Sequence, residues 1–136
     1  MPHDTRIAVV LRDDLAQWQK LNVACFVAGG LVGAEPELAG LPYVDGSGAT
    51  YRPLVRQPIM VFATDAEGLR RAFGRARERG LVPAIYTAAL FATGNDADNR
   101  AAVAAVATDA LDLVGMALHG TRRDVDKVTK GLALHP

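Results

Sequence analysis

The sequence predicts an α/β domain in which strands and helices alternate along the chain and pack in layers. Apolar runs rich in branched side chains recur along the chain, and residues that can start a helix follow several of them. Half of the 136 residues are hydrophobic, as in a packed globular domain. Alternating strands and helices are the signature of a layered α/β fold. The length suits one domain, so we expect a single domain over residues 1–136.

The first predicted unit is a strand over residues 6–11, where apolar side chains follow one another without polar alternation. This pattern suits a strand that is covered on both faces. A helix should follow over residues 15–32, with Asp14 and Gln17 as its capping pair. The apolar spacing predicts a buried face formed by Leu21, Ala24, Cys25, Ala28 and Leu31. On that face the Cys25 thiol is expected to act as a small core hydrophobe.

Residues 35–58 interrupt the alternation. Four prolines exclude a long helix in this segment. Residues 43–51 have the pattern of a β-hairpin whose turn residues tolerate positive φ. The segment is too short to hold a core of its own, so we interpret it as an excursion that partly covers the sheet.

The alternation resumes with a strand over residues 59–63. Thr64 and Glu67 form a capping box that should open a helix to Arg79, and Gly80 has the C′ position that ends it. A third core strand is expected to follow this glycine, over residues 82–86.

A polar stretch over residues 93–100 leads into an Ala/Val-rich run over residues 101–107. We predict a short helix for the run, although its two valines leave a strand open. A fourth strand is expected over residues 111–118. Thr121 should then start a last short helix that carries Leu132.

Charge and composition exclude several classes of protein. Acidic and basic residues balance at 15 each. Proteins that bind RNA or DNA usually carry a basic surplus, so nucleic acid is disfavoured as the main partner. A single cysteine excludes an intrachain disulfide and a thiolate metal cage. The amino terminus lacks the pattern of a signal peptide, and no run approaches about 18 apolar residues, so we expect a soluble, cytoplasmic protein without a membrane partner.

The turn after the first strand holds the first candidate site, formed by Arg12, Asp14, Lys20 and Asn22. In open α/β sheets, ligands bind outside the carboxyl ends of the strands. There Lys20 would donate to a carbonyl or anchor an anion, and Asp14 would orient it. The alternative is that Asp14 only caps the helix and the other charges are solvated. Trp18 is either a lid over the sheet or a core residue.

The second candidate site lies in residues 93–100, where Thr93, Asn95 and Asp96 can bind a ligand through side chains and free amides. The alternative role is helix capping by Asn95 or Asp96, which needs only one such residue. Asp96, Asp98 and Asn99 offer oxygen ligands, but the spacing of a calcium-binding loop is absent, so no metal site is predicted.

Other chemistry has weaker support. His119, after the fourth strand, is the one plausible catalytic imidazole, and Ser47 does not lie in a Gly-x-Ser-x-Gly elbow. A row of arginines that begins at Arg71 could meet phosphate, but a solvated helix face is favoured. Gly29-Gly30 lies at a helix end rather than between strand and helix, so no dinucleotide fingerprint and no cofactor are predicted.

Motifs spread over nearly the whole chain form a specific combination. They are Arg12, Asp14-Leu15, Trp18-Gln19-Lys20-Leu21-Asn22, Pro42-Tyr43, Phe91-Ala92-Thr93-Gly94-Asn95-Asp96, Asp112-Leu113-Val114-Gly115 and Asp126-Lys127. This combination resembles an uncharacterised bacterial family, the domain of unknown function number two thousand. That family looks like a branch of the peptidyl-tRNA hydrolase II fold. The resemblance implies a three-layer α/β/α domain with a mixed four-stranded sheet and helices on both faces.

The resemblance to the hydrolases themselves is uneven. Five residues match their motif when one turn residue is skipped: Arg12, Asp14, Leu15, Lys20 and Cys25. The Gln and His that follow the Lys in those enzymes fall on Ala24 and Val27, and their Asp-Ala-Gly loop falls near Ala88. The resemblance therefore implies a relative that lacks the catalytic Asp, Gln and His.

Two hypotheses about function follow. The first is a hydrolase that acts on a different ester or amide, in a pocket between the two candidate sites. Its catalytic residues would be Lys20 and Asp14, and its substrate-binding residues would be Arg12, Asn22, Thr93, Asn95 and Asp96. The second is a non-catalytic small-ligand-binding or regulatory module on the same fold. Both imply a small-molecule or peptide-like ligand and a homodimer, while the neutral charge disfavours tRNA as a partner.

Overall fold

Strands and helices alternate along the chain in the computed structural model, which describes residues 4–136. The strands are β1 (Thr5–Arg12), β2 (Tyr43–Val44), β3 (Thr50–Tyr51), β4 (Ile59–Thr64), β5 (Ala84–Thr87), β6 (Leu113–Thr121) and β7 (Ala133–Leu134). The α-helices are α1 (Gln17–Ala34), α2 (Ala66–Glu78), α3 (Asp96–Ala104) and α4 (Arg122–Val128). The 3₁₀-helices are η1 (Pro36–Leu38), η2 (Ala88–Ala92) and η3 (Thr108–Ala110). The first three residues of the predicted domain lie outside the described range.

The main sheet has five strands in the order β5-β6-β1-β4-β7, not the predicted four. β1 runs parallel to β4, whereas β6 is antiparallel to both β1 and β5. The additional strand, β7, pairs with β4 through Phe62↔Leu134 and Ala63↔Ala133. A strand of two residues is too short to show a periodicity, so no pattern in the sequence predicts it. The mixed α/β class is the predicted one.

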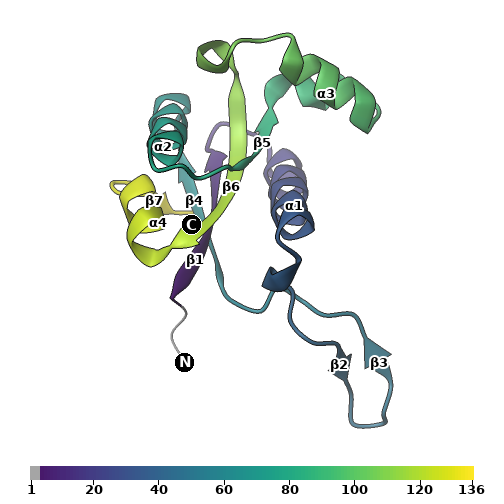
Figure 1. The fold of residues 1–136 in the computed structure, drawn as a ribbon. Helices are drawn as coiled ribbons and strands as arrows, with labels where there is room; N and C mark the ends of the chain where they lie inside the picture. Colours follow the sequence, from purple (N-terminus) through teal and green to yellow (C-terminus); the bar gives the residue numbers. More distant parts are fainter. Residues whose placement is uncertain (1–3) are drawn as a thin grey trace.

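Helices cover both faces of the main sheet, in the predicted three-layer arrangement (Figure 1). α1 packs on one face, and α2 and α4 pack on the other. Along β1, Ile7, Val9 and Leu11 face α1, while Ala8 and Val10 face α2 and α4. The strand is apolar without alternation because neither of its faces meets water. Each of its larger side chains stabilises the fold by roughly 1.5–3 kcal/mol on burial.

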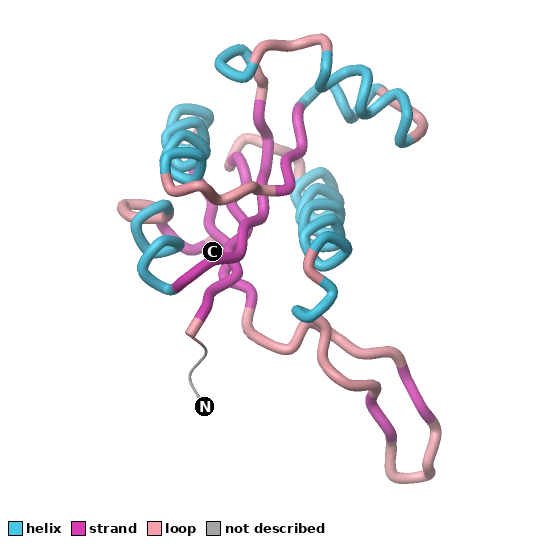
Figure 2. The backbone as a smooth tube through the Cα atoms, in the orientation of Figure 1, coloured by secondary structure: helices cyan, strands magenta, loops and turns pink. Residues whose placement is uncertain are grey.

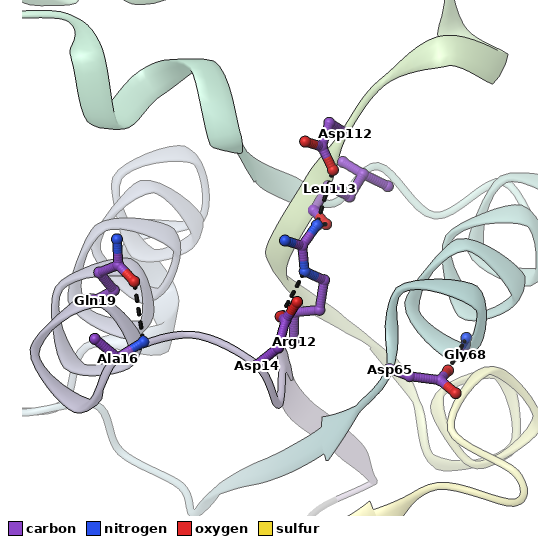
Figure 3. A network of polar contacts seen from close by, with 8 residues as sticks. All are labelled: Arg12, Asp14, Ala16, Gln19, Asp65, Gly68, Asp112 and Leu113. Atoms are coloured by element: carbon purple, nitrogen blue, oxygen red, sulfur yellow. Dashed lines mark hydrogen bonds and ion pairs between the residues drawn. The ribbon is translucent and has the colours of Figure 1, made fainter.

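α1 begins at Gln17, later than predicted, and is capped differently. Ala16 precedes the helix, and its N–H donates to Gln19 Oε1 at 3.0 Å (Figure 3). Asp14, the predicted cap, instead accepts a hydrogen bond from Arg12 Nε at 2.7 Å. The predicted cap is wrong because the helix starts at Gln17, which makes Ala16 the N-cap and leaves Asp14 two residues before it.

The buried face of α1 also differs from the prediction. Val23, Val27 and Leu31 are buried, whereas Leu21 and Cys25 are exposed. At about 100° per residue, the observed face is rotated by roughly a quarter turn from the predicted one. The prediction failed because α1 is apolar on nearly every side, so the spacing does not single out one face. Cys25 is therefore not a core residue.

α2 is capped by Asp65, whose carboxylate accepts from the Gly68 N–H at 2.8 Å (Figure 3). The predicted capping box began one residue too early, because Thr64 is the last residue of β4 and pairs with Arg12. Gly80 follows the helix with φ of +72°, a left-handed conformation that glycine adopts without strain. Its predicted C′ position is confirmed.

α3 begins inside the predicted polar stretch. Asn95 is its N-cap and accepts from the Asp98 N–H at 2.8 Å. The helix continues into the Ala/Val-rich run and ends at Ala104, so the helix interpretation of that run is correct.

The last elements follow the prediction with small shifts. β5 begins at Ala84 and β6 begins at Leu113, two residues after their predicted starts. Thr121 caps α4 as predicted, since its hydroxyl accepts from the Asp124 N–H at 3.1 Å. Leu132 lies after the helix rather than on it, although it packs against the core.

Strands β2 and β3 form the predicted hairpin, but the hairpin does not cover the main sheet. It lies in an arm, residues 41–54, that projects from the body of the molecule beyond the end of α1 (Figure 2). Every residue of the arm is exposed. The prediction that residues 35–58 partly cover the sheet is therefore wrong for the hairpin, because α1 already occupies the sheet face on that side. It holds for the ends of the segment, where Leu38 is buried in the core and Val55 packs against it.

Candidate functional site

Three strands bring polar residues to one end of the main sheet, which we call the strand edge. β1 and β4 are parallel and end at this edge, while β6 is antiparallel to β1 and starts there. Arg12, the last residue of β1, therefore lies beside Asp112, which precedes β6 (Figure 3). This is the kind of edge at which ligands bind in open α/β sheets.

At this edge the guanidinium of Arg12 bridges two carboxylates, those of Asp14 and Asp112. Its Nε lies 2.7 Å from Asp14 Oδ1, and its Nη1 lies 2.8 Å from Asp112 Oδ1. Nη1 also donates to the carbonyl oxygen of Leu113 at 3.5 Å. The hydrogen bond from Arg12, supported by the charges of Arg12 and Lys20, lowers the pKa of Asp14 below its ordinary 3.8. Asp14 is thus a weak base at neutral pH, which suits an ion pair better than proton transfer.

A cavity of about 490 Å³ lies between α1 and the segment that follows β5. We call it the aromatic cavity. Its lining consists of Trp18, Asn22, Phe26, Tyr86, Leu90, Phe91, Thr93, Gly94, Asn95, Asp96 and Asn99. Its volume falls within the range of roughly 300–1,000 Å³ that is typical of small-ligand sites.

Four aromatic side chains form the walls of the aromatic cavity. The ring centroids of Trp18 and Phe91 are 6.1 Å apart, and those of Phe26 and Tyr86 are 5.7 Å apart, both in edge-to-face geometry. The ring centroid of Tyr86 also lies 5.1 Å from that of Phe91. Aromatic pairs attract one another over these distances. Burial raises the pKa of Tyr86, so its phenol stays protonated. Trp18 and Phe26 are both more than half exposed, so a bound ligand can cover them.

Thr93 is fixed on the polar rim of the cavity by two partners. Its hydroxyl lies 2.9 Å from the carbonyl oxygen of Leu90 and also contacts the side-chain amide of Asn99. The hydroxyl has a single proton, which it can donate to only one of them. Both acceptors, the Leu90 carbonyl oxygen and Asn99 Oδ1, belong to the same segment of the chain as Thr93. The rim of the cavity is therefore preorganised at this point.

The other rim residues differ in whether their polar groups already have partners within the chain. Asn95 caps α3 and donates from Nδ2 to Asp98 at 2.9 Å, and Asp96 forms an ion pair with Arg100. Asn22 is different, because within residues 4–136 its side-chain amide has no hydrogen-bond partner. Its donor and acceptor groups are both available to a ligand.

The structure brings together only part of the predicted site. Asn22, Thr93, Asn95 and Asp96, predicted from two distant segments, all line the aromatic cavity. Arg12 and Asp14 lie instead in the ion-pair network at the strand edge. Lys20 lines a separate groove of about 280 Å³, the Lys20 groove, which also contains Leu11, Gln17, Leu21, Ala24, Val61 and His135. The predicted catalytic pair, Lys20 and Asp14, therefore lies outside the cavity that holds the predicted binding residues.

Sequence reasoning missed most of the aromatic wall. The sequence does not predict Phe26 and Tyr86 as site residues, because an aromatic residue in an apolar helix or strand is usually a core residue. Asn99 is predicted only as a possible oxygen ligand of a metal, not as a residue of this cavity. Trp18 was considered as a lid, and its indole does border the cavity. A signal existed at Phe91, which belongs to the motif that continues into Thr93 and Asp96.

Two other kinds of site considered in the sequence, a catalytic histidine and a metal site, are not part of the aromatic cavity. His119 pairs with Ile7 near the opposite end of β1, and its Nδ1 lies 2.8 Å from Glu35 Oε1. Within residues 4–136, no group of three His, Cys, Asp or Glu side chains is arranged to hold a metal ion. In the same part of the chain, no helix combines the length and apolarity needed to cross a membrane.

Comparison with known proteins gives a family but no activity. The family described as "Protein of unknown function (DUF2000)" matches residues 5–136. The chain belongs to this family. A solved structure of a protein of unknown function from Agrobacterium tumefaciens strain C58 is 50% identical and superposes with a TM-score of 0.95. The match covers 99% of this chain and 100% of the other. No curated protein gives a significant match.

The DUF2000 family assignment confirms the resemblance drawn from the sequence motifs. A relation of the DUF2000 family to the peptidyl-tRNA hydrolase II fold stays a prediction. Both the family and the Agrobacterium protein are described as of unknown function, so function has to be argued from the site itself.

Proposed function

We propose that this chain binds a small ligand that has an aromatic or other flat apolar body and an amide or carbonyl head. The observation that carries the proposal is the combination, in one cavity, of four aromatic side chains with a rim of amide and hydroxyl groups. Small-ligand sites generally pair an apolar lining with a few polar groups that fix the orientation of the ligand. The aromatic walls would hold the body, and the rim would orient the head.

The chemistry of the rim supports an uncharged head. Asn22 offers a donor and an acceptor on one side chain, which is complementary to an amide. Asp96 is the only charged side chain among the residues that line the cavity, and Arg100 already pairs with it. A charged head would therefore find no free opposite charge. Blocked amino acids and short peptides carry the required groups.

Trp18 provides a direct test, because it is the single tryptophan of the chain and lines the cavity. The probe is N-acetyl-phenylalaninamide, which has an aromatic ring and two amides but no indole. Its titration should change the Trp18 emission in a saturable manner. N-acetyl-glycinamide, which lacks the apolar body, should leave the emission unchanged. N-acetyl-leucinamide is a second probe, with an apolar body that is not aromatic. An unchanged emission with both the phenylalanine and the leucine derivative would contradict the proposal.

Hydrolysis of an ester or amide is the second candidate, and the position of Asp96 favours it. Its carboxylate lies on the same rim as the amides of Asn22 and Asn95. A carboxylate can accept a proton from an attacking water, and amide N–H groups can stabilise the oxyanion that forms. Thr93 would help to hold the substrate. In this role the chain would act on the head of the ligand that the cavity binds.

Lys20 and Asp14 are the alternative catalytic pair for such a hydrolase. The charge of Lys20 reaches Asp14, although neither residue lines the aromatic cavity. Hydrolysis can be tested with N-acetyl-phenylalanine ethyl ester, with the corresponding anilide and with peptidyl-tRNA. Turnover of any of them by the wild-type chain would support the second candidate. Saturable binding of the probe without any turnover would leave binding as the function.

A further inference from the structure

The arm, residues 41–54, is a preformed hairpin rather than a loose loop. Its base is held by Gly40 N–H donating to Leu54 O at 2.9 Å and Arg56 N–H donating to Leu38 O at 2.8 Å. At its tip the Asp45 carboxylate accepts hydrogen bonds from the N–H groups of Ser47 and Ala49, at 2.9 and 3.0 Å, and from the Tyr51 hydroxyl at 2.8 Å. Both ends of the arm are therefore ordered by the chain itself.

The apolar side chains of the arm have nothing to pack on within the described part of this chain. The arm points away from the sheet and from α1 (Figures 1 and 2). Its exposed apolar and aromatic side chains are Leu41, Tyr43, Val44, Tyr51 and Leu54. An isolated two-stranded hairpin is at best marginally stable in water, since it has no core. A hairpin with this many exposed apolar groups is stabilised when a second surface covers them.

α1 offers a second uncovered apolar surface on the same chain. We call it the outer face, and it consists of Leu21, Cys25, Gly29 and Gly33, all of which are exposed. Trp18 and Phe26 border this face but belong to the aromatic cavity. A helix that is apolar on every side is normally covered on every side. The sheet covers only the side that carries Val23, Val27 and Leu31. A Cβ atom placed at Gly29 or Gly33 would meet no other atom within 4 Å, so this side of the helix is open.

Both surfaces have the composition of an interface core. Lys20 is the only charged residue in α1, and it lies off the outer face, in the Lys20 groove. The arm contains two charged residues, Asp45 and Arg52, and Asp45 is already bonded within the hairpin. Depletion of charge with enrichment of aromatic residues distinguishes the centre of an interface from the remaining surface. Elsewhere the chain is richly charged, since 22% of all its residues are Asp, Glu, Lys or Arg.

We infer that the arm packs on the outer face of α1 of a second copy of this chain, and that the exchange is reciprocal. A two-fold symmetric pair needs each surface and its complement on the same chain, and the projecting arm and the flat helix face meet that condition. The arm and the outer face together supply eighteen exposed residues. A stable interface uses about 20–30 residues on each side. The two surfaces therefore supply most of the residues that the interface of a stable dimer needs.

Sedimentation equilibrium of the full chain tests the dimer. The wild-type chain should sediment as a dimer, while Cys25→Arg should weaken the dimer by at least about a hundredfold, because it buries an unpaired charge. The double variant Leu41→Ser/Leu54→Ser should also shift the chain toward a monomer. Val82→Arg is the matched control, since Val82 is exposed but lies outside both surfaces, and it should stay dimeric. A wild-type monomer at every concentration, or equal effects in all three variants, would overturn the inference.

Cross-linking tests the arrangement, because Cys25 is the only cysteine of the chain and lies on the outer face. The wild-type chain is mixed with a Cys25→Ser/Val44→Cys chain and then oxidised. A covalent pair of the two different chains is expected, since the only thiols lie on the helix of one and the arm of the other. A Cys25→Ser/Val82→Cys chain should not link to the wild type. If Cys25 of one wild-type chain links to Cys25 of another, and no link forms to the thiol introduced at Val44 of the arm, the exchange is overturned. The α1 helices of the two chains would then face each other.

Discussion

Lys20 and Asn22 are two positions apart in α1, yet they line different cavities. Side chains two positions apart on a helix differ in direction by about 200°, so they point to opposite flanks. Asn22 borders the aromatic cavity, whereas Lys20 borders the groove that contains Leu11 and Val61. The two residues therefore separate two models of the site: one centred on the aromatic cavity, the other on the strand edge.

Asn22→Ala should weaken binding of N-acetyl-phenylalaninamide about fivefold, because it removes roughly 1 kcal/mol of hydrogen bonding from the rim. Lys20→Ala should leave the affinity within about twofold, since its side chain lies on the other flank of the helix. Both affinities are measured from the Trp18 emission. A loss in Lys20→Ala that equals the loss in Asn22→Ala would argue for the strand-edge model.

Asp96→Asn separates the two catalytic assignments if the chain hydrolyses the phenylalanine ester. A carboxylate that takes a proton in the transition state typically contributes about a hundredfold or more, so kcat should fall by that factor. Asp14→Asn should change kcat much less, because Asp14 does not line the aromatic cavity. The comparison is made in initial-rate assays at neutral pH. A large loss in Asp14→Asn and Lys20→Ala with normal activity in Asp96→Asn would reverse the assignment.

The layered fold could be predicted because its central strands, β1 and β6, are buried on both faces. The uninterrupted run from Ile7 to Leu11 is only compatible with such a strand, and helices were the only elements left to cover it. The orientation of α1 could not be predicted, because Leu21 and Phe26 are as apolar as Val23 and Val27. If the outer face packs on a second chain, its residues are apolar because of that contact and not because they belong to the core. A single sequence does not distinguish the two kinds of burial.

The candidate site was predictable in its polar part only. Asn22 and Asn95 are far apart in the sequence but were expected together, because both follow strands that end at one edge. Arg12 and Lys20 were grouped with Asn22 by proximity in the sequence, which the helix geometry does not respect. The aromatic wall could not be derived, since nothing in the sequence separates a cavity-lining Tyr86 from a core tyrosine.

The ion pair between Arg12 and Asp14 should make stability depend on pH in a defined direction. The pKa of Asp14 is lower in the folded chain than its ordinary 3.8. Its contribution to stability is therefore fully present above about pH 4 and is lost as the pH falls through the lower, folded value. Asp14→Asn should cost at most about 1 kcal/mol at neutral pH, because the carboxylate is 61% exposed and screened by solvent. Urea unfolding at neutral pH and at steps below pH 4 should show this difference shrink.

Asp13→Asn is the matched control for that experiment, because Asp13 is an exposed neighbour outside the ion pairs of the described residues. Its effect should stay within about 0.5 kcal/mol at every pH. A difference between Asp14→Asn and the wild type that persists or grows in acid would contradict the ion-pair explanation.

Gly115 should be the glycine of β6 that tolerates a methyl group least. It pairs with Leu11 and Tyr86 in the centre of the sheet, beneath α1. A Cβ atom at this position would lie 2.4 Å from Val23 Cγ1 and 3.2 Å from Leu11 Cδ2. Val23 is fully buried and cannot move aside, so Gly115→Ala should cost about 1–3 kcal/mol of unfolding free energy. Urea unfolding measures this cost.

Gly74→Ala is the matched substitution in α2, where a Cβ atom would meet nothing within 4 Å. It should stabilise the chain by about 0.5–1 kcal/mol, because alanine favours the helix over glycine. The double variant Gly115→Ala/Val23→Ala removes the branch that causes the clash, so it should cost less than the sum of its two single changes. Strict additivity of those changes would mean that the Gly115→Ala cost comes from the strand itself. The close packing of α1 on β6 would then not be its cause.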